Sequence, residues 1–376
     1  MADRPAPLVG VVDPSGREAE FGSYASAALT GQSLLAAELS RRLGAQGAAV
    51  ARLVPRADPD QDTFHWGRWF ATAMRGVLAG ASGEVDAIGY AGAGSLALAG
   101  DGLLDELLSP VPGEVVANNR FSTDAFVVAG DLDAALRALD GAGSDNGAVR
   151  SLEDAGFRSR DLRSAPWSRF DVDTPLDLAL LRLATRLPDT RRPAAAVAGF
   201  LEMATLPGGR PLEVPHLHAL GEVVRDRHGE LVVAGRVPAS ALTYLETETA
   251  CRVRAVVEER GMRSARDTRP RSILADWAER MGPADLVGEL ASLGDAVVLD
   301  TRVLMAARAG SSEASAWPPE EERFASDFGD AGRIATPWLR ELTEAAASAS
   351  VPLLLGGHAL VSDGLPILVE AAWLGR

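Results

Sequence analysis

Two aspartates spaced two residues apart are the clearest candidates for chemistry in this sequence. Asp171 and Asp173 stand in the segment 169–178, which reads RFDVDTPLDL. On an extended segment, residues two apart point to the same side, so the two carboxylates could share a hard cation such as Mg²⁺. A solvated acidic turn ahead of a helix has the same composition. The spacing therefore indicates either a metal site or an exposed turn.

The residues that follow these aspartates specify the start of a helix. Thr174 can cap the helix, Pro175 is favoured at the first helical position, and Asp177 stands at the third. Thr174 and Asp177 together form a capping box, and the Asp177 carboxylate also opposes the positive end of the helix dipole. We therefore expect a strand end that leads into a helix beginning at Pro175.

The segment 170–178, FDVDTPLDL, resembles the closing signature of the nucleotidyltransferases that include molybdenum-cofactor guanylyltransferase and phospholactate guanylyltransferase. Weaker matches occur in the same order as in that family, at a Gly-containing loop over 11–22 and at the segments 31–35, 118–124 and 144–147. The likeness covers residues 8 to 186, roughly half of the chain. It implies an α/β fold with a doubly wound, mostly parallel sheet, similar to the nucleotide-diphospho-sugar transferases.

The resemblance also implies a site. In such families a nucleotide or nucleotide-sugar lies over the carboxyl ends of the parallel strands, as ligands generally do in open α/β sheets. The first loop would wrap the phosphates with its N–H groups, and Mg²⁺ at the catalytic pair Asp171 and Asp173 would neutralise the transferred diphosphate. The residues that would then bind the nucleotide and its acceptor are Gly16, Arg17, Gly22, Asn118, Asn119 and Arg120.

The sequence departs from the family pattern at three positions. Glu20 stands where the first loop normally has an arginine, the nearby lysine is absent, and the strand end at 88–95 has no acidic residue for the metal. Catalysis of phosphoryl transfer depends mainly on charges positioned around the transferred phosphate, so these losses matter. Arg17 could replace one cation, and Asp86 or Asp101 could approach the metal if the strands are shifted.

Two functions therefore stay open. The first is metal-dependent nucleotidyl transfer from an NTP to a small phosphorylated or carboxylated acceptor. The second is a nucleotide-binding, structural or interaction protein that has kept the fold without the chemistry. Fold alone does not choose between them, because function belongs to the site.

Composition excludes several other functions. All 37 basic residues are arginines, which excludes Schiff-base chemistry and the phosphate-binding lysine of a Walker loop. The 52 acidic residues give a net charge of −15, so nucleic acid and membrane surfaces are poor partners. Cys251 is the only cysteine, so an intramolecular disulfide is impossible and a cytoplasmic location is the simplest expectation.

The order of apolar runs predicts the elements of the first half. Runs of strand length alternate with helical patterns from residue 8 to residue 185, which is typical of a sheet with crossover helices. The expected strands are 8–13, 49–54, 86–90, 114–118 and 125–129, with helices over 34–43 and 66–77. Trp66, Trp69 and Phe70 could stack on a base, but their helical spacing favours burial in the core.

The charged segment 187–193 contains two prolines and predicts a domain boundary. We expect a nucleotidyltransferase-like domain over 1–187 and an α+β domain over 195–376. In the second domain, alternation over 222–225 and 230–236 around a turn predicts a β-hairpin. The remaining expected elements are helices over 239–248, 273–281, 284–293 and 337–347, and strands over 296–299 and 352–355.

The second domain offers two weaker candidate sites. His216 and His218 have a spacing compatible with Zn²⁺, but no third ligand is adjacent, and an exposed or structural pair has the same pattern. The run Leu353 to His358 is typical of a strand that enters a Gly-Gly turn, which could form an anion-binding nest or simply a tight turn.

Overall fold

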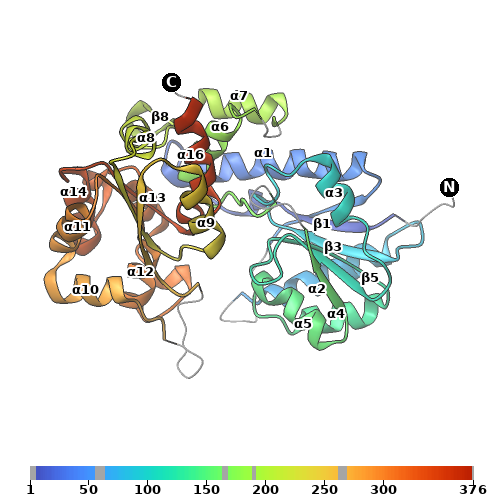
Figure 1. Ribbon diagram of the computed structural model, residues 1–376. Coiled ribbons are helices and arrows are strands. Elements are labelled where there is room, and N and C mark those ends of the chain that lie inside the picture. The colour runs from blue at the N-terminus through green and yellow to red at the C-terminus, as the bar shows by residue number, and fades with distance from the viewer. Residues whose placement is uncertain (1–5, 56–63, 163–167, 189–191, 261–268, 375–376) are drawn as a thin grey trace. The chain divides into compact units, whose positions relative to one another are not determined.

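The structure is a computed structural model that describes residues 6–55, 64–162, 168–188, 192–260 and 269–374 (Figure 1). The described residues form two compact units. The first unit takes those within 6–19, 28–162, 168–173 and 192–200, and the second unit takes those within 20–27, 174–188, 201–260 and 269–374. None of the helices in the described part of the chain is both long enough and apolar enough to cross a membrane.

The first unit is built on a six-stranded, mostly parallel sheet, as the sequence predicts. Its strands lie in the order β2-β1-β3-β5-β4-β6, and only β5 runs antiparallel to its neighbours. The strands are β1 (Leu8–Val12), β2 (Ala49–Leu53), β3 (Ala87–Ala91), β4 (Glu114–Ala117), β5 (Ala125–Ala129) and β6 (Arg158–Asp161).

Helices cover both faces of this sheet because successive strand residues alternate between two cores. In β5, Phe126 and Val128 belong to one core, whereas Val127 belongs to the other. The helices of this unit are α1 (Tyr24–Ala45, from residue 28), α2 (Trp66–Ala79), α3 (Asp101–Leu107), α4 (Leu132–Asp140), α5 (Ala148–Asp154) and the start of α7 (Ala195–Met203). Trp66 and Phe70 stack at 5.2 Å in the core, which confirms the core interpretation of that stripe.

The FDVD segment is a loop and not the strand end that the sequence predicts. Val172 is buried and donates its N–H to the carbonyl of Gly94 at 3.3 Å, while Gln32 of α1 donates to the carbonyl of Val172 at 2.9 Å. A Cβ at Gly94 would lie 2.2 Å from that carbonyl oxygen. The glycine after β3 is therefore required by the protein's own backbone.

The helix after this segment begins as predicted. In α6 (Pro175–Ala184), the N–H of Asp177 donates to Oγ1 of Thr174 at 3.2 Å, and the N–H of Thr174 donates to Asp177 Oδ2 at 2.9 Å. The helix is almost wholly buried and packs against α16 (Gly364–Leu374). The chain leaves the first unit at Asp173, ahead of α6, and returns to it over 192–200.

The second unit contains a four-stranded sheet in the order β10-β9-β11-β12, and all of its pairings are parallel. Its strands are β9 (Glu230–Gly235), β10 (Arg252–Val257), β11 (Ala296–Asp300) and β12 (Leu353–Gly356), beside a short antiparallel pair β7 (Thr205–Leu206) and β8 (Arg210–Pro211). A parallel sheet needs crossover connections. The expected α+β class is therefore wrong, and this unit is α/β.

Helices precede, connect and follow these strands. They are α8 (Leu217–Arg225), α9 (Ala239–Glu248), α10 (Ile273–Met281), α11 (Pro283–Ser292), α12 (Arg302–Ala309), α13 (Glu320–Asp327), α14 (Pro337–Ala347), α15 (His358–Val361) and α16. The predicted hairpin is wrong, because its first arm is the end of α8. That helix buries Leu220, Gly221 and Val224 on one face, a helical spacing that is hidden when only 222–225 are considered.

Changing Gly94 to Ala should test the contact between the FDVD segment and β3. The new Cβ would clash with a backbone oxygen, so we expect a loss of about 1 to 3 kcal/mol in unfolding free energy. Gly76 is the matched control, since it is exposed within α2 with open space around it, and Gly76→Ala should stabilise by about 0.5 to 1 kcal/mol. Chemical denaturation measures both, and equal stability of Gly94→Ala and wild type would contradict the packing.

Candidate functional site

Polar residues gather at one edge of the first sheet. Because β1, β2, β3, β4 and β6 all run in the same direction, their carboxyl ends meet at this edge. Asp13 follows β1, Asn118 follows β4, and Asp161 ends β6. The strand order reverses between β1 and β3, which is where open α/β sheets place their ligands.

The loop after β1 is organised by a buried carboxylate. Asp13 is 4% exposed, and its Oδ1 accepts the N–H of Ser15 at 2.9 Å, which caps the short turn Pro14–Gly16. Its other oxygen forms an ion pair with Arg52 of β2. The N–H of Arg17 donates to the carbonyl of Pro14 at 2.9 Å. Two of the amides that the resemblance assigns to phosphates are thus already used within the loop.

The predicted loop residues themselves lie on the surface. Gly16 and Arg17 are both exposed. Gly22 is also exposed, with a positive φ of 78°, but it belongs to the second unit. The structure therefore brings Gly16 and Arg17 to the edge of the first sheet, and it describes Gly22 as part of a separate compact unit.

The three predicted residues after β4 differ in their roles. Asn118 is 1% exposed, and its Oδ1 accepts the N–H groups of Asp124 and Ala125, both at 3.0 Å. Asn119 is 5% exposed and its Oδ1 accepts the N–H of Phe121 at 3.2 Å. Both asparagines therefore shape the turn that leads into β5. Arg120 is exposed, and is the one of the three whose side chain a ligand could readily reach.

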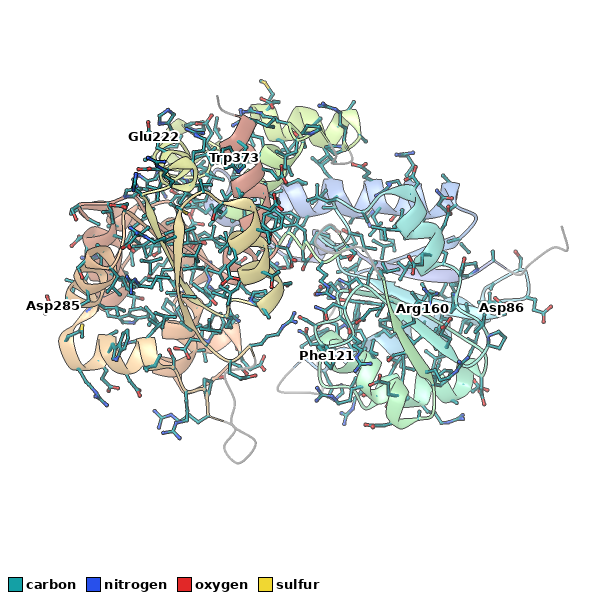
Figure 2. The ribbon with its side chains drawn as sticks, viewed as in Figure 1. Asp86, Phe121, Arg160, Glu222, Asp285 and Trp373 are labelled. Atoms are coloured by element: carbon teal, nitrogen blue, oxygen red, sulfur yellow. The ribbon has the colours of Figure 1, made fainter. Side chains whose placement is uncertain are left out.

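Phe121 was not predicted from the sequence as a site residue. Phe121 is 62% exposed (Figure 2). The guanidinium of Arg120 lies 4.5 Å from the centroid of its ring. The backbone N–H of Arg120 is held by Asp161 at 2.7 Å. An exposed aromatic ring on a fixed turn is a surface on which a planar group can stack. The signal in the sequence was an aromatic residue inside an otherwise polar strand-end segment.

A second polar loop lies against this turn. The Ser122 hydroxyl donates to Oδ1 of Asn146 at 2.7 Å, and the Tyr90 hydroxyl of β3 donates to Oδ2 of Asp145 at 3.2 Å. Burial raises the pKa of the Asp145 carboxyl, although its hydrogen bonds act in the opposite direction. Perturbed carboxyls of this kind are common at functional sites, and Asp145 adds an acid to the edge that the sequence had suggested only as a helix start.

The predicted metal pair offers two carboxylates. Asp171 is half-buried and Asp173 is exposed, with the buried Val172 between them. No group of three His, Cys, Asp or Glu residues in the described ranges is placed to hold a metal ion. Mg²⁺ is often held by one or two carboxylates together with substrate phosphates, so the pair fits a metal that arrives with a nucleotide.

The two alternative acids do not join this pair. Asp86 directly precedes β3 and therefore lies at the amino end of that strand, at the opposite edge of the sheet. Asp101 begins α3 and forms an ion pair with Arg42 of α1 at 2.9 Å.

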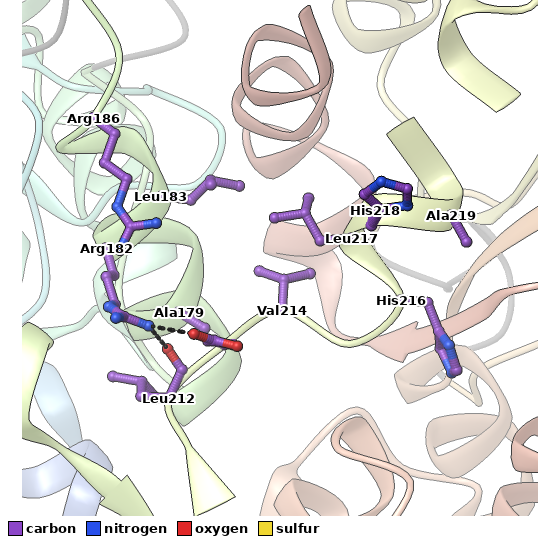
Figure 3. A pocket seen from close by; sticks show the side chains of 11 residues that line it. Ala179, Arg182, Leu183, Arg186, Leu212, Val214, His216, Leu217, His218 and Ala219 are labelled. Carbon is purple, nitrogen blue, oxygen red and sulfur yellow. Dashed lines mark hydrogen bonds and ion pairs between the residues drawn. The ribbon is translucent and has the colours of Figure 1, made fainter. Parts of the chain in front are cut away.

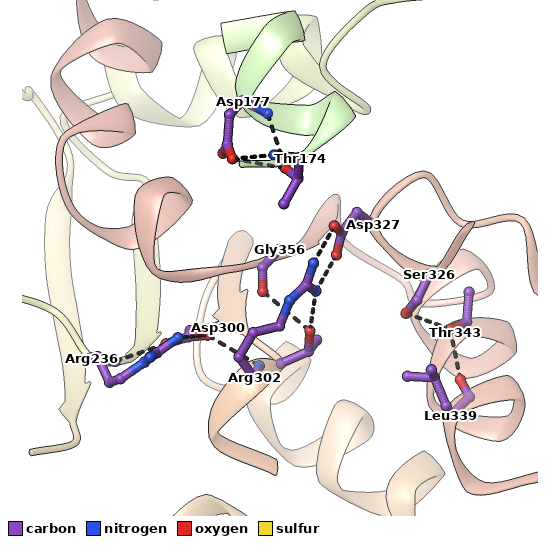
Figure 4. Close-up of polar contacts among 11 residues, drawn as sticks. Thr174, Asp177, Arg236, Asp300, Arg302, Ser326, Asp327, Leu339, Thr343 and Gly356 are labelled. Atoms are coloured by element: carbon purple, nitrogen blue, oxygen red, sulfur yellow. Dashed lines mark hydrogen bonds and ion pairs between the residues drawn. The ribbon is translucent and has the colours of Figure 1, made fainter. Parts of the chain in front are cut away.

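The second unit has its own polar strand-end cluster, which was not predicted (Figure 4). Asp300 ends β11 and is fully buried, and Arg236 after β9 binds it through Nε at 2.6 Å and Nη2 at 3.1 Å. Burial acts to raise the pKa of Asp300, but Arg236 and other nearby cations outweigh it and hold that pKa below its usual value. The pair lies where the order of the second sheet reverses, between β9 and β11.

A second buried ion pair continues this cluster. Arg302, the first residue of α12, contacts both carboxylate oxygens of Asp327 in α13, at 2.5 and 2.6 Å. Its Nη1 also donates to Oγ1 of Thr301, whose hydroxyl donates to the carbonyl of Gly356 at 3.1 Å. These contacts join the ends of β11 and β12 to α13.

His358 lies beside this cluster at the start of α15. Burial is the main cause that lowers the pKa of His358 to about 4, and the nearby guanidinium of Arg236 acts in the same direction. Gly356 of the Gly-Gly turn faces Leu360 and Leu176, and Gly357 faces Arg302. The turn is therefore packed against the unit's own side chains, which favours the tight-turn interpretation over an anion nest.

Comparison with known proteins gives no family. No protein-family model matches this chain, and no curated protein matches it either.

The pKa of His358 predicts a specific pH dependence. The folded protein binds this proton less tightly than the unfolded chain does. The contribution of neutral His358 to the unfolding free energy is therefore fully present above about pH 6.5 and is lost as the pH falls towards 4. The loss amounts to about 3 kcal/mol at pH 4.

His358→Gln lacks the titrating group and should lose less unfolding free energy over this interval. Urea denaturation of both proteins between pH 7 and pH 4, within the range in which they stay folded, measures the two slopes. Parallel curves would contradict the burial of a neutral ring.

Proposed function

We propose that the first unit binds a nucleotide at the carboxyl edge of its sheet and does not transfer the nucleotidyl group. The observation that carries this proposal is the exposed ring of Phe121, held by Arg120 on a turn whose two asparagines are buried. A purine or pyrimidine base can stack on such a ring, and the arginine adds a planar cation beside it.

The position of the ring supports the proposal. It follows β4 at the edge where five parallel strands end, on the turn that leads into β5, the neighbour of β3. Ligands of open α/β sheets bind at such edges. The sheet is mostly parallel, with helices on both faces, which is the general fold class on which the proposal depends.

The loop after β1 argues against transfer. Transfer of a nucleotidyl group depends on cations and N–H groups aimed at the phosphates. Here the carboxylate of Asp13 accepts the N–H of Ser15 and forms an ion pair with Arg52. The guanidinium of Arg52 is therefore already paired within the protein. The chain contains no lysine that could replace it, and Arg17 is the exposed cation of this loop.

Mg²⁺ would serve binding in this arrangement. Asp171 and Asp173 would hold it together with the phosphates of the nucleotide, and the ion would neutralise part of their charge. The backbone contacts of Val172 with Gly94 and Gln32 hold the segment that carries both carboxylates.

Phe121→Ala should weaken nucleotide binding. Base stacking on an aromatic ring contributes about 1 to 3 kcal/mol, so we expect the Kd to rise roughly tenfold or more. Isothermal titration calorimetry with GTP, ATP, CTP and UTP in the presence of Mg²⁺ measures the change. Met203→Ala is the matched control, since Met203 is an 81% exposed apolar residue of α7 outside the first unit.

An equal Kd for Phe121→Ala and wild type would show that the base does not stack on Phe121. If no nucleotide binds the wild-type protein measurably, the proposed function is wrong.

The absence of transfer has its own test. Each NTP is incubated with Mg²⁺ and a panel of small phosphorylated or carboxylated acceptors, and pyrophosphate release is followed. We expect no release above that of the double variant Asp171→Asn/Asp173→Asn, because the loop after β1 has no lysine and the neighbouring Arg52 is paired with Asp13. Release by the wild type but not by this variant would show instead that the protein is a working nucleotidyltransferase.

A further inference from the structure

Arg169 of the first unit is a cation that no carboxylate in the described part of the chain compensates. It stands in the segment 168–173, which also carries the two aspartates of the candidate metal pair. Its Nε is buried without a hydrogen-bond partner, and its guanidinium forms no ion pair with a described residue. The hydroxyl of Ser168 beside it is also buried without a partner. Buried polar groups without partners are rare in proteins, and a ligand is one source of the missing acceptor.

The arginines that line the cavity in Figure 3 show the opposite situation. This cavity of about 560 Å³ lies in the second unit. Arg182 of its lining forms ion pairs with Glu213 at 3.2 Å and with Glu202 at 3.1 Å, and Arg186 pairs with Glu202 at 3.5 Å. Both guanidinium groups therefore have acceptors within the protein, whereas the charge of Arg169 is available to a ligand.

The exposure of successive side chains indicates which way Arg169 faces. Buried and more accessible residues alternate along the segment 168–173. The buried residues are Ser168, Phe170 and Val172, and the more accessible ones are Arg169, Asp171 and Asp173. Side chains two residues apart on an extended chain point to the same side. Arg169 therefore shares the accessible side of this segment with the two aspartates.

Two backbone hydrogen bonds bring this segment close to the turn that carries Phe121. The N–H of Val172 donates to the carbonyl of Gly94 at 3.3 Å, and the N–H of Gly92 donates to the carbonyl of Asp124 at 2.8 Å. The short loop after β3 thus contacts the segment through one residue and the turn between β4 and β5 through another. The unpaired guanidinium and the exposed ring consequently lie on two segments that flank one loop, at the carboxyl edge of the first sheet.

We propose that Arg169, in place of the loop after β1, binds the phosphate groups of the nucleotide. This inference rests on the proposed function, because it concerns the ligand of the same edge. Arginine binds phosphate oxygens through paired N–H groups. Mg²⁺ at Asp171 and Asp173 would contact the same phosphates, and Mg²⁺ and Arg169 together outweigh the charge of the two carboxylates. One arginine supports binding, whereas transfer needs further cations around the leaving diphosphate.

Three probes separate the phosphates from the base. The NTP that binds most tightly carries both, its nucleoside carries the base alone, and tripolyphosphate carries the phosphates alone. Isothermal titration calorimetry in the presence of Mg²⁺ measures each Kd for wild type and for Arg169→Gln. Because the variant loses a charged hydrogen-bond donor, its Kd for the NTP and for tripolyphosphate should rise about tenfold. Its Kd for the nucleoside should stay within about twofold of wild type, since the base does not contact Arg169.

Arg158→Gln is the matched control for the loss of one positive charge. Arg158 is exposed and begins β6, which runs parallel to β4, so it lies at the opposite edge of the same sheet. The control should bind tripolyphosphate as tightly as wild type. Thermal denaturation checks that both variants are folded.

Tripolyphosphate distinguishes a failure of this inference from a failure of the proposed function. If it binds Arg169→Gln as tightly as wild type, or does not bind wild type at about 1 mM, the inference is overturned. Equal weakening in Arg158→Gln would reduce the effect to net charge and would also overturn it. If tripolyphosphate binding depends on Arg169 but no NTP binds more tightly than tripolyphosphate, the phosphate site stands and the proposed base site is wrong.

Discussion

A buried carboxylate at the end of a parallel strand must be compensated, and in this protein the cation that compensates it is always arginine because the chain has no lysine. Asp13 pairs with Arg52 after β1, and Asp300 pairs with Arg236 after β11. The planar guanidinium suits this role, since Arg236 binds both carboxylate oxygens at once. The ends of neighbouring strands are thereby tied together in each sheet. The same ion pairs use up cations that would otherwise face a ligand.

Local features of this fold could be predicted from the sequence, and long-range ones could not. The start of α6 follows from Thr174 and Asp177, which lie three residues apart and make the same two bonds wherever the helix packs. The partner of Asp300 is Arg236, which lies 64 residues earlier. Nothing in the local pattern of either residue identifies the other. The candidate site also has a predictable and an unpredictable part. Its position at the strand ends was expected from the sequence, whereas the exposure of Phe121 depends on how the turn folds.

One error in the second unit, the predicted hairpin, arises from a short window. The residues 222–225 were interpreted as a strand, but the burial of Leu220, Gly221 and Val224 has the period of a helix. Four residues are too few to show that period, because it needs at least one full turn on either side of them.

The distribution of arginines then limits what chemistry the chain can support. Those at the strand ends are engaged by buried carboxylates, whereas Arg120 is exposed beside Phe121 at the candidate site. An exposed guanidinium stacks on planar groups and binds an oxyanion through paired N–H groups, but it is poorly fixed for stabilising a transition state. Transition-state stabilisation needs cations held in place before the reaction begins. Of the described arginines, the two fixed at strand ends, Arg52 and Arg236, are paired with carboxylates. This pairing is the physical basis of the proposal that the first unit recognises a ligand without converting it.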